Sequence, residues 1–260
     1  MVKSFRDVVF FGANVKVAEA VQQIGDISTI ITEKTHFSHD LYDFSQCVGA
    51  EFRAVERLSE LSDLNEMSWD LGISCGLGLI FKSKHIERFE HGIWNIHYGP
   101  LPEVRGRHPI SWAFLSDLPF GVTVHIIDEQ IDRGTILVKE YVERNYGDTQ
   151  IEIDEKIEKV IRSGLLQRAV DSYQNGEGYE APEGKLYPSL AGVYENIEPA
   201  DHDSKFVYNL FKSQFIFGGV RVREKQYLRC KFFCAEYSDS YAGWDIWECS
   251  DGVKVALSEA

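Results

Sequence analysis

The N-terminal part of the chain alternates between short apolar runs and a helical pattern, and this alternation constrains the fold more than any other feature. Asp7–Gly12 is an apolar run that ends in glycine, which predicts a buried strand. Val15–Ile24 carries Val, Ala and Ile at helical spacing, and the β-branched run Ile27–Thr32 predicts a second strand. Strand, helix and strand in this order favour a parallel sheet with helices on its faces.

Later segments extend the same sheet. Glu51–Val55 and Trp69–Ile80 predict two further strands, the second running into a glycine-rich turn. Gly121–Ile127 alternates as a strand does, and Thr135–Val142 follows with another. The predicted fold class is therefore α/β, a Rossmann-like open sheet with parallel strands and flanking helices. Gly12 is not followed by the glycines of a dinucleotide fingerprint, so the topology is predicted without NAD binding.

The composition changes after a long amphipathic helix, predicted over Thr149–Tyr173. Gly176–Pro188 contains Gly and Pro and is typical of a linker, and from Phe215 onward the chain consists of short strand-like runs. We therefore expect a main domain over residues 1–180 and a small, mostly β C-terminal domain over residues 181–260.

The charge of the chain limits its partners. Lysine and arginine number 27 and aspartate and glutamate 41, which gives a net charge of −14. Such an acidic protein has no overall attraction to nucleic acid or to an anionic membrane. No apolar run reaches the roughly 18 residues that span a bilayer, and Met1–Phe5 lacks the layout of a signal peptide. We expect a soluble, cytoplasmic protein with no membrane and no nucleic-acid partner.

The cysteines do not form a ligand pattern. There are five, an odd number at irregular spacings. Cys230 and Cys234 are four residues apart in a strand-like segment, and only Cys249 lies near them. A structural zinc site requires more ligands than these. We expect reduced, buried thiols and no metal site.

Three polar residues stand where the predicted strands end. Asn95 interrupts the apolar run Ile93–Ile96, and His97 follows at strand periodicity, so both side chains point the same way. The Gly- and Pro-rich stretch His97–Arg107 must then be a loop. Asp132 lies in a second loop, after the strand Gly121–Ile127. Ligands bind at the carboxyl edge of the strands in an open α/β sheet, so we expect the three side chains to meet there.

Transfer of an acyl group to an amine is a reaction that these three residue types fit. Neutral His97 can accept the proton that the amine loses, and the amide of Asn95 can donate to the carbonyl oxygen as it gains negative charge. A carboxylate such as Asp132 favours the imidazolium that forms. No serine or cysteine elbow has matching spacing, which favours direct attack by the amine. Taken one at a time, each residue has an ordinary structural interpretation as a loop histidine, a turn aspartate or an asparagine before a turn.

A longer set of residues surrounds these three. It consists of Asn95-Ile96-His97, Leu101-Pro102, Arg105-Gly106, Pro109, Trp112, Gly121-Val122-Thr123-Val124-His125 and Asp132-Arg133-Gly134. Together these resemble the folate-dependent formyltransferase family, which includes methionyl-tRNA formyltransferase, glycinamide ribonucleotide transformylase and the sugar N-formyltransferases. The resemblance is close over residues 90–140 and looser over the α/β pattern before them. It implies that Asn95, His97 and Asp132 are the catalytic residues.

The resemblance also implies 10-formyltetrahydrofolate as the formyl donor. Its pterin is expected to be held by backbone groups of two segments, which include Cys75, Gly76, Leu77, Gly78, Leu79, Phe81, Asp128 and Gln130. The chain departs from the family after the histidine, where Tyr98-Gly99-Pro100 replaces the usual serine and leucine. His125 shares a strand face with Thr123 and has two interpretations, a support for the catalytic residues or a buried histidine with satisfied hydrogen bonds.

The sequence favours a small acceptor. A tRNA acceptor would require a basic surface, and the glycinamide ribonucleotide enzymes resemble only the first domain. The amine of a nucleotide-linked amino sugar, of the dTDP-amino-deoxysugar type, fits better, as in lipopolysaccharide O-antigen biosynthesis. Candidate substrate-binding residues are Lys82, Lys84, Tyr98, Arg105 and Arg107. A homodimer through the C-terminal domain is also implied. The alternatives are methionyl-tRNA formyltransferase, formyltetrahydrofolate hydrolase, and a non-catalytic folate- or sugar-nucleotide-binding protein.

Overall fold

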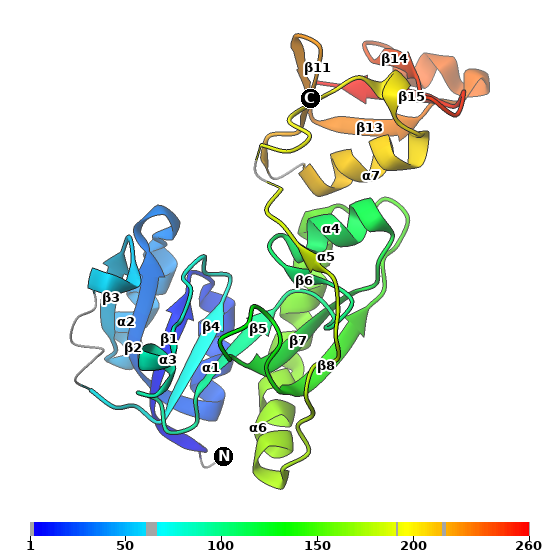
Figure 1. Ribbon diagram of the computed structural model, residues 1–260. Coiled ribbons are helices and arrows are strands. Elements are labelled where there is room, and N and C mark those ends of the chain that lie inside the picture. The colour runs from blue at the N-terminus through cyan, green and yellow to red at the C-terminus, as the bar shows by residue number, and fades with distance from the viewer. Residues whose placement is uncertain (1–2, 61–66, 191, 215–216, 260) are drawn as a thin grey trace. The chain divides into compact units, whose positions relative to one another are not determined.

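A seven-stranded sheet, in the order β3-β2-β1-β4-β5-β7-β8, forms the centre of the fold (Figure 1). The computed structural model describes residues 3–60, 67–190, 192–214 and 217–259. Neighbouring strands from β3 to β5 run parallel, and β7 pairs with β5 in the antiparallel direction. The strands are β1 (Phe5–Gly12), β2 (Gly25–Glu33), β3 (Glu51–Val55), β4 (Leu71–Cys75), β5 (Ile93–His97), β7 (Phe120–Ile126) and β8 (Ile136–Val142). The predicted α/β open sheet is confirmed.

The chain forms two compact units, each built from separate stretches of sequence. Unit 1 consists of Met1–Arg105, Gly121–Val142 and Lys156–Lys185. Unit 2 consists of Gly106–Phe120, Glu143–Glu155 and Leu186–Ala260. The sequence-based boundary near residue 180 lies close to the last of these crossings, and a division into domains 1–180 and 181–260 stays a prediction.

Helices cover the sheet of unit 1 because their apolar faces match it. Asn14 caps the first helix by accepting from the backbone N–H groups of Lys16 and Val17, and that helix buries Val17, Val21 and three further side chains. The strands beneath are buried on both faces, as a covered parallel sheet requires. Each fully buried Val, Leu or Ile contributes about 1.5–3 kcal/mol. The helices are α1 (Val15–Ile24), α2 (His39–Val48), α3 (Ser83–Ile86) and α6 (Leu166–Asn175), with 3-10 turns at Lys34–His36 and Leu58–Glu60.

Two predicted elements end earlier than the periodicity suggested. The predicted strand Trp69–Ile80 stops at Cys75, because Gly76 takes a left-handed φ of 69° that no strand continues. The single helix predicted over Thr149–Tyr173 is wrong, because α5 (Gln150–Val160) is followed by a π-helical turn over Ile161–Leu165. Gly164 has a φ of 97° there, and α6 begins after it. The apolar spacing continues through the break and therefore conceals it.

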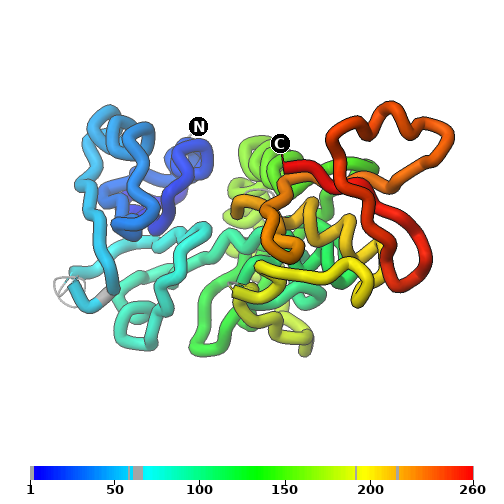
Figure 2. The backbone as a smooth tube through the Cα atoms, turned by 90° about the horizontal axis from the view of Figure 1, so that it is seen from above, coloured from blue at the N-terminus to red at the C-terminus, as the bar shows by residue number. Residues whose placement is uncertain are grey.

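Unit 2 contains small sheets together with helices. Its strands from residue 220 onward join two three-stranded sheets that are separate from the central sheet, as the prediction of a small C-terminal β unit requires. The yellow-to-red part of the tube in Figure 2 follows these strands and the helix α7 before them, which packs against β13 and α4. The elements are β6 (Arg105–Gly106), α4 (Pro109–Ser116), β9 (Leu186–Tyr187), β10 (Asn196–Ile197), a 3-10 turn (Pro199–Asp201), α7 (Ser204–Gln214), β11 (Val220–Val222), β12 (Lys225–Tyr227), β13 (Arg229–Phe232), a 3-10 segment (Ala235–Tyr241), β14 (Asp245–Glu248) and β15 (Lys254–Ser258).

Three sequence-based expectations differ here in detail. The strand expected from Phe215 begins at residues 215–216, which lie outside the described residues. The predicted linker Gly176–Pro188 belongs to unit 1 up to Lys185, where Tyr179 pairs with Ile136 through two backbone hydrogen bonds, and to unit 2 from Leu186. Of the five cysteine thiols, those of Cys47 and Cys234 are exposed rather than buried. Among the described residues, no helix has the length and apolar character needed to cross a membrane.

Candidate active site

Four polar side chains line one face of the β5–β7 pair. Asn95 lies directly opposite His125, and His97 lies opposite Thr123. Cross-strand partners share a sheet face, so the alternation predicted for Asn95 and His97 places both beside the polar residues of β7. His97, Thr123 and His125 are buried, and Asn95 is partly exposed. A row of buried polar groups on a core strand requires partners, and these groups find them in one another and in two loops.

Asp132 reaches this face by a route that the sequence did not show. Because β7 runs antiparallel to β5, its carboxyl end lies beside Trp94, at the opposite end of β5 from His97. The expectation that Asp132 follows a neighbouring strand end at the same edge is therefore wrong. The loop over residues 128–134 instead folds back, and Asp132 adopts a left-handed φ of 49° within it. Such a backbone costs an L-residue about 1–2 kcal/mol, so surrounding contacts must hold it.

Gly134 makes that return possible. A Cβ at this position would lie 1.7 Å from the carbonyl oxygen of Ile126, so only glycine fits. The adjacent Thr135 carbonyl accepts from the backbone N–H of Ile126 at 2.8 Å, which closes the loop. The Asp132 carboxylate, with 11% of its side chain exposed, then lies 3.7 Å from His97 Nδ1 through Oδ2 and 3.4 Å from His125 Nε2 through Oδ1. The structure thus brings the three sequence-predicted residues Asn95, His97 and Asp132 together.

The imidazole of His97 is held in one orientation. Its Nε2 lies 2.7 Å from the carbonyl oxygen of Val104, and a carbonyl can only accept, so Nε2 carries a hydrogen and donates it. In the neutral ring, Nδ1 then has the free lone pair, and this atom faces Asp132. A proton arriving at Nδ1 is therefore placed beside a carboxylate.

The buried position of His97 keeps its ring neutral. Burial lowers the pKa of His97 below its ordinary value, and a proton on His125 would lower it too, whereas Asp132 and the Val104 carbonyl act in the raising direction. The lowering prevails, so at neutral pH the ring can accept a proton. A base that is neutral before the reaction and beside a carboxylate afterwards suits removal of a proton from an amine.

His125 contacts two members of the trio. Its Nε2 lies 3.2 Å from Asn95 Nδ2 as well as near Asp132, and its Nδ1 donates to the Ile126 carbonyl at 3.2 Å. Because Nδ1 carries the hydrogen, the Nε2 lone pair accepts from the Asn95 amide. This fixes which end of the Asn95 side chain carries the donors, and the second amide hydrogen can serve an oxyanion. Of its two sequence interpretations, these contacts favour a support for Asn95 and Asp132.

The loop after β5 is tied down along its length. The hydroxyl of Thr123 donates to the Gly99 carbonyl at 2.8 Å and accepts from the backbone N–H of Leu101 at 3.0 Å. Lys139 Nζ donates to the Leu101 carbonyl at 2.7 Å and pairs with Glu103 at 3.3 Å. These bonds fix the loop that carries Val104, and with it the orientation of His97.

The two segments expected to hold a pterin flank the trio in different ways. Cys75 is in register with Ile96, so the residues after it leave the sheet at the edge where β5 ends. There the backbone at Gly76 and Gly78 is exposed, while Leu77, Leu79 and Phe81 pack against the core. In the other segment, Asp128 and Gln130 line a cavity of about 300 Å³, whose further lining residues include Arg133, Thr135 and Glu180. The first segment offers backbone groups beside apolar side chains, as a planar heterocycle requires, whereas the cavity at the second segment has a mostly polar lining.

The residues predicted to bind the acceptor lie in different places. Lys82 and Lys84 are exposed at the start of α3, and Tyr98 is partly exposed directly after His97. Arg107 is exposed and belongs to unit 2. Arg105 is buried, and its two terminal nitrogens donate to the backbone carbonyls of Gly184 and Ile131 at 2.8 and 2.7 Å. The expectation that Arg105 presents a charge to a phosphate does not match this buried geometry.

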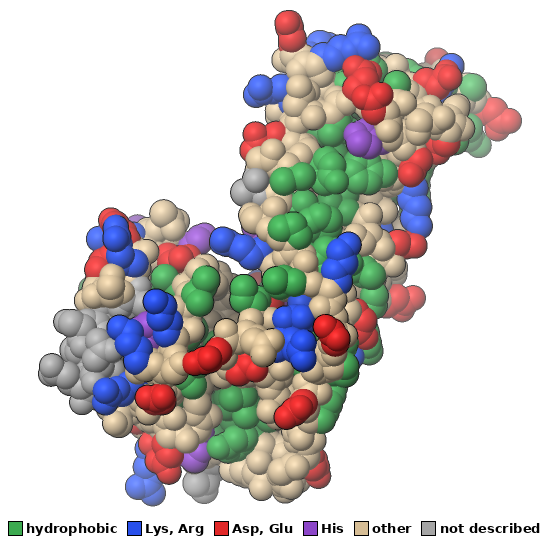
Figure 3. Space-filling view, viewed as in Figure 1, with side chains coloured by type: hydrophobic (Ala, Val, Ile, Leu, Met, Phe, Trp, Pro, Cys, Tyr) green, Lys and Arg blue, Asp and Glu red, His purple; other side chains and the backbone are tan. Residues whose placement is uncertain are grey.

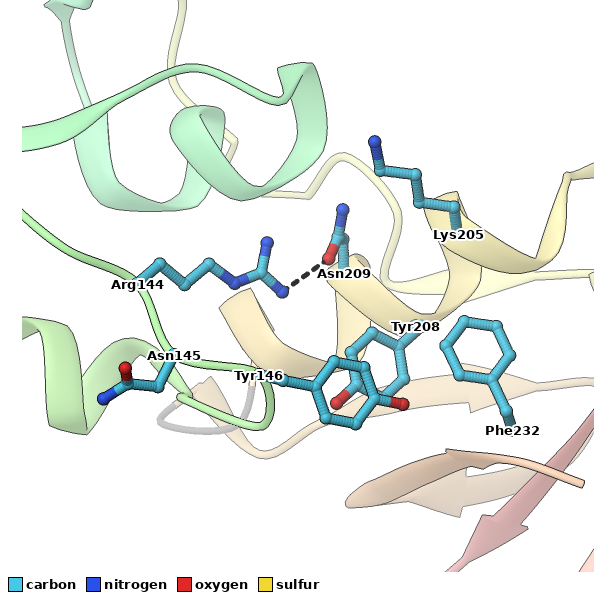
Figure 4. A pocket seen from close by; sticks show the side chains of 7 residues that line it. All are labelled: Arg144, Asn145, Tyr146, Lys205, Tyr208, Asn209 and Phe232. Carbon is cyan, nitrogen blue, oxygen red and sulfur yellow. Dashed lines mark hydrogen bonds between the residues drawn. The ribbon is translucent and has the colours of Figure 1, made fainter.

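A second cavity, in unit 2, has a different character. It measures about 300 Å³ and is lined by Arg144, Asn145, Tyr146, Lys205, Tyr208, Asn209 and Phe232. Figure 4 shows the guanidinium of Arg144 directed at Asn209, to which it donates at 2.8 Å, and the rings of Tyr146 and Tyr208 stacked face to face. The Lys205 ammonium points away from the rings and pairs with Asp117. This cavity presents ring faces rather than converging charges or a base, so the candidate active site is the one in unit 1.

Comparison with known proteins finds curated relatives of this chain. Methionyl-tRNA formyltransferase of Finegoldia magna is 23% identical over 210 residues, and that of Thermodesulfovibrio yellowstonii is 31% identical over 117 residues. These matches cover 75% and 45% of this chain, but only 65% and 38% of the relatives' own lengths.

Solved sugar N-formyltransferases share the fold over nearly the whole chain. WlaRD, a sugar 3N-formyltransferase solved in the presence of dTDP and 5-N-formyl-THF, superposes with a TM-score of 0.75 at 16% identity over 99% of this chain and 98% of its own. The N-formyltransferase from Helicobacter canadensis, solved with folinic acid and dTDP-3-aminofucose, superposes with a TM-score of 0.73 at 16% identity over 99% of both chains. The family model described as formyl transferase matches residues 14–169, more than half of the 260 residues. The chain is thus a member of the formyl transferase family.

Proposed function

We propose that this protein is an N-formyltransferase that moves a formyl group from 10-formyltetrahydrofolate to the amine of a nucleotide-linked amino sugar of the dTDP-amino-deoxysugar type. The observation that carries the proposal is the convergence of Asn95, His97 and Asp132 on one sheet face, with the carboxylate 3.7 Å from His97 Nδ1. Binding alone requires neither an oriented base nor a carboxylate beside it, which argues against a non-catalytic folate- or sugar-nucleotide-binding protein.

The three residues divide the work. His97 Nδ1 accepts the proton that the amine nitrogen gives up as that nitrogen bonds to the formyl carbon. The amide of Asn95 donates to the formyl oxygen, which gains negative charge as the bond forms. Asp132 stabilises the imidazolium, and the same proton is then available to the nitrogen from which the formyl group departs. No residue needs to form a covalent intermediate in this sequence.

The donor fits the residues that flank the trio. Bound 10-formyltetrahydrofolate would supply the formyl group, and the segments Cys75–Phe81 and Asp128–Asp132 would hold its pterin through backbone groups. The half-buried Leu77 and Leu79 provide apolar contact beside the exposed backbone of Gly76 and Gly78. The solved neighbours that share the fold were obtained with folinic acid or 5-N-formyl-THF, which supports a folate here as well.

The acceptor is inferred from charge and from the neighbours. The curated relatives are named methionyl-tRNA formyltransferases, which favours a tRNA acceptor as the second candidate. The net charge of −14 opposes it, because tRNA binding needs cations that meet phosphates. On the face shown in Figure 3, blue cationic side chains lie among red carboxylates over the described surface. The two neighbours with the highest TM-scores given above were solved with dTDP or a dTDP-amino sugar, so a sugar nucleotide is the proposed acceptor. A homodimer through the C-terminal part and a cytoplasmic location stay predictions.

Mass spectrometry can test the acceptor directly. The protein is incubated with 10-formyltetrahydrofolate and either a panel of amino-sugar nucleotides or methionyl-tRNA, and the products are searched for the mass of an added formyl group. We expect formylation of at least one dTDP-linked amino sugar by the wild-type protein and none by a folded His97→Asn variant. Formylation of methionyl-tRNA alone would replace the proposed acceptor. Release of formate without any formylated amine would identify a hydrolase instead.

A further inference from the structure

Arg105 is a buried charge with no carboxylate partner among the described residues. Only 8% of the residue is exposed, and its Nη1 and Nη2 donate to the backbone carbonyls of Gly184 and Ile131. Its Nε is buried without a hydrogen-bond partner. Burying a guanidinium against neutral carbonyls is costly, and an apolar residue could fill the same space at lower cost. A charge kept under these conditions calls for a role beyond packing.

The two carbonyls belong to segments that matter to the site. Ile131 directly precedes Asp132, so the bond from Arg105 holds the peptide group that leads into the left-handed Asp132 backbone. Gly184 lies in the packed segment after α6, and a Cβ there would meet the Pro102 carbonyl oxygen at 2.2 Å. Arg105 therefore joins this segment to the loop that carries the carboxylate.

Val104, the residue before Arg105, contacts His97, the residue against which Asp132 is held. The Val104 carbonyl receives the Nε2 hydrogen of His97 at 2.7 Å. Two consecutive residues thus hold both groups: Val104 orients the base through its backbone, and Arg105 orients the carboxylate loop through its side chain. A shift of either residue would change the 3.7 Å separation between His97 Nδ1 and Asp132 Oδ2.

We propose that Arg105 is a positioning residue, which fixes Asp132 against His97 by holding the Ile131 carbonyl, and that it does not bind the acceptor's phosphates. The inference rests on the proposed function in that it assigns Asp132 a role in formyl transfer. It separates Arg105 from the exposed cations Lys82, Lys84 and Arg107, which remain candidates for binding an anionic acceptor.

The test is a double-mutant cycle between Arg105→Lys and Asp132→Asn. Lysine keeps the positive charge but cannot hold two carbonyls with a planar fork. We expect R105K to lower kcat roughly 10–100-fold, in line with a misplaced catalytic group, with KM for both substrates within about threefold of the wild type. If Arg105 acts through Asp132, the R105K/D132N protein will be no slower than D132N alone.

The matched control is Arg144→Lys, which makes the same substitution at a partly buried arginine of unit 2. The Arg144 guanidinium donates to the Asn209 side chain, and neither residue belongs to the loops that carry Asp132 and Val104. The effect of R144K on kcat should multiply with that of D132N, whereas the effect of R105K should not. Multiplying effects for R105K, or a KM raised tenfold at unchanged kcat, would overturn the assignment in favour of substrate binding or an independent role.

A second readout requires no substrate. NMR titration of the His97 ring in wild-type and R105K protein reports the distance of the Asp132 charge, because that charge raises the pKa of His97. A looser Asp132 should therefore lower the His97 pKa in R105K, and R144K should leave it unchanged. An unaltered titration in R105K would contradict the proposal even if the wild type transferred no formyl group, so the two failures are distinguishable. If R105K does not fold, Arg105→Gln, which retains one amide donor and removes the buried charge, replaces it.

Discussion

His97 donates the hydrogen on its Nε2 to the carbonyl oxygen of Val104 at 2.7 Å, and this bond leaves Nδ1 as the only ring atom that can take up a proton. The accepting atom therefore faces Asp132 rather than the loop. The loop is in turn held by Thr123 and Lys139, so the basic atom of the site is selected by backbone and side-chain contacts that lie outside the trio.

Replacing His97 should abolish most of the activity without unfolding the protein. We expect His97→Asn to lower kcat by roughly 10²–10⁴-fold, the range for a positioned acid–base group. Steady-state kinetics with a thermal melt checks both parts, and His91→Asn, at a half-buried histidine that bonds to Tyr173, is the matched control. Turnover near the wild-type level in folded H97N protein would exclude His97 as the base.

The acid limb of the pH–rate profile should lie below the ordinary pKa of a histidine side chain. Burial lowers the pKa of His97 from 6.5, so the neutral base persists to lower pH than in a free imidazole. The acid limb of kcat/KM should therefore fall below about pH 6.5. The Asp132 charge acts in the raising direction, so Asp132→Asn should move that limb to still lower pH. A limb above pH 6.5, or an upward shift in D132N, would show that another group controls the profile.

The lowered pKa of His97 also makes the stability of the folded protein depend on pH. Because the folded protein binds the His97 proton more weakly than the unfolded chain, this contribution to stability is fully present above the unfolded pKa of 6.5 and is lost as the pH falls through the folded value. Urea unfolding of wild-type and H97N protein at about pH 7 and about pH 5 measures it. The wild type should lose more stability than H97N over that interval, and equal losses would contradict the assignment.

The Asp132→Asn substitution tests whether Asp132 acts as a catalytic carboxylate or only as a residue of its turn. The substitution keeps the side-chain shape and removes the charge that favours the imidazolium. We expect kcat to fall by roughly 10²-fold or more, with a small change in donor affinity and little change in melting temperature. A rate within about threefold of the wild type together with a lower melting temperature would assign Asp132 to the structure of its own loop.

Thr123→Val should weaken the fold and loosen the loop after β5. The substitution removes a buried hydroxyl and leaves the Leu101 N–H and the Gly99 carbonyl without their partner. Each unsatisfied buried group costs about 1–3 kcal/mol, so we expect a loss of at least about 1 kcal/mol in the free energy of unfolding. Denaturant unfolding measures it, and an unchanged midpoint would mean that the loop finds other partners. Thr123→Ser, which retains the hydroxyl, is the control.

The sequence predicted the sheet and two members of the site for clear physical reasons. The period of two along Ile93–His97 placed Asn95 and His97 on one face, and the structure agrees. The position of Asp132 in a loop and the resemblance identified this residue, but the sequence did not show how its loop reaches His97. The alternation in Gly121–Ile127 is the same for a parallel and an antiparallel strand, so nothing in it showed that β7 would reverse direction.

The role of Arg105 was hidden for a different reason. Its carbonyl partners, Gly184 and Ile131, are far away in the sequence, and backbone acceptors have no sequence signature. An arginine in a Gly- and Pro-rich loop is usually exposed, so the sequence suggested a phosphate contact.

The break between α5 and α6 was also missed. Helical spacing continues across the left-handed Gly164, although that glycine was the available signal of a break.

The composition of unit 2 from three stretches of chain affects how the protein can be divided. The stretch Gly106–Phe120 enters unit 2 between the loop of His97 and the strand of His125, and its helix α4 packs against α7. A protein cut after Lys185 would keep α4, with the buried side chains of Ile110 and Phe114, and lose α7. The fragment would carry the proposed catalytic residues Asn95, His97 and Asp132 yet expose an apolar helix face, which favours aggregation. A chimaera of this chain with a relative should therefore fold better when all three stretches of unit 2 are replaced together.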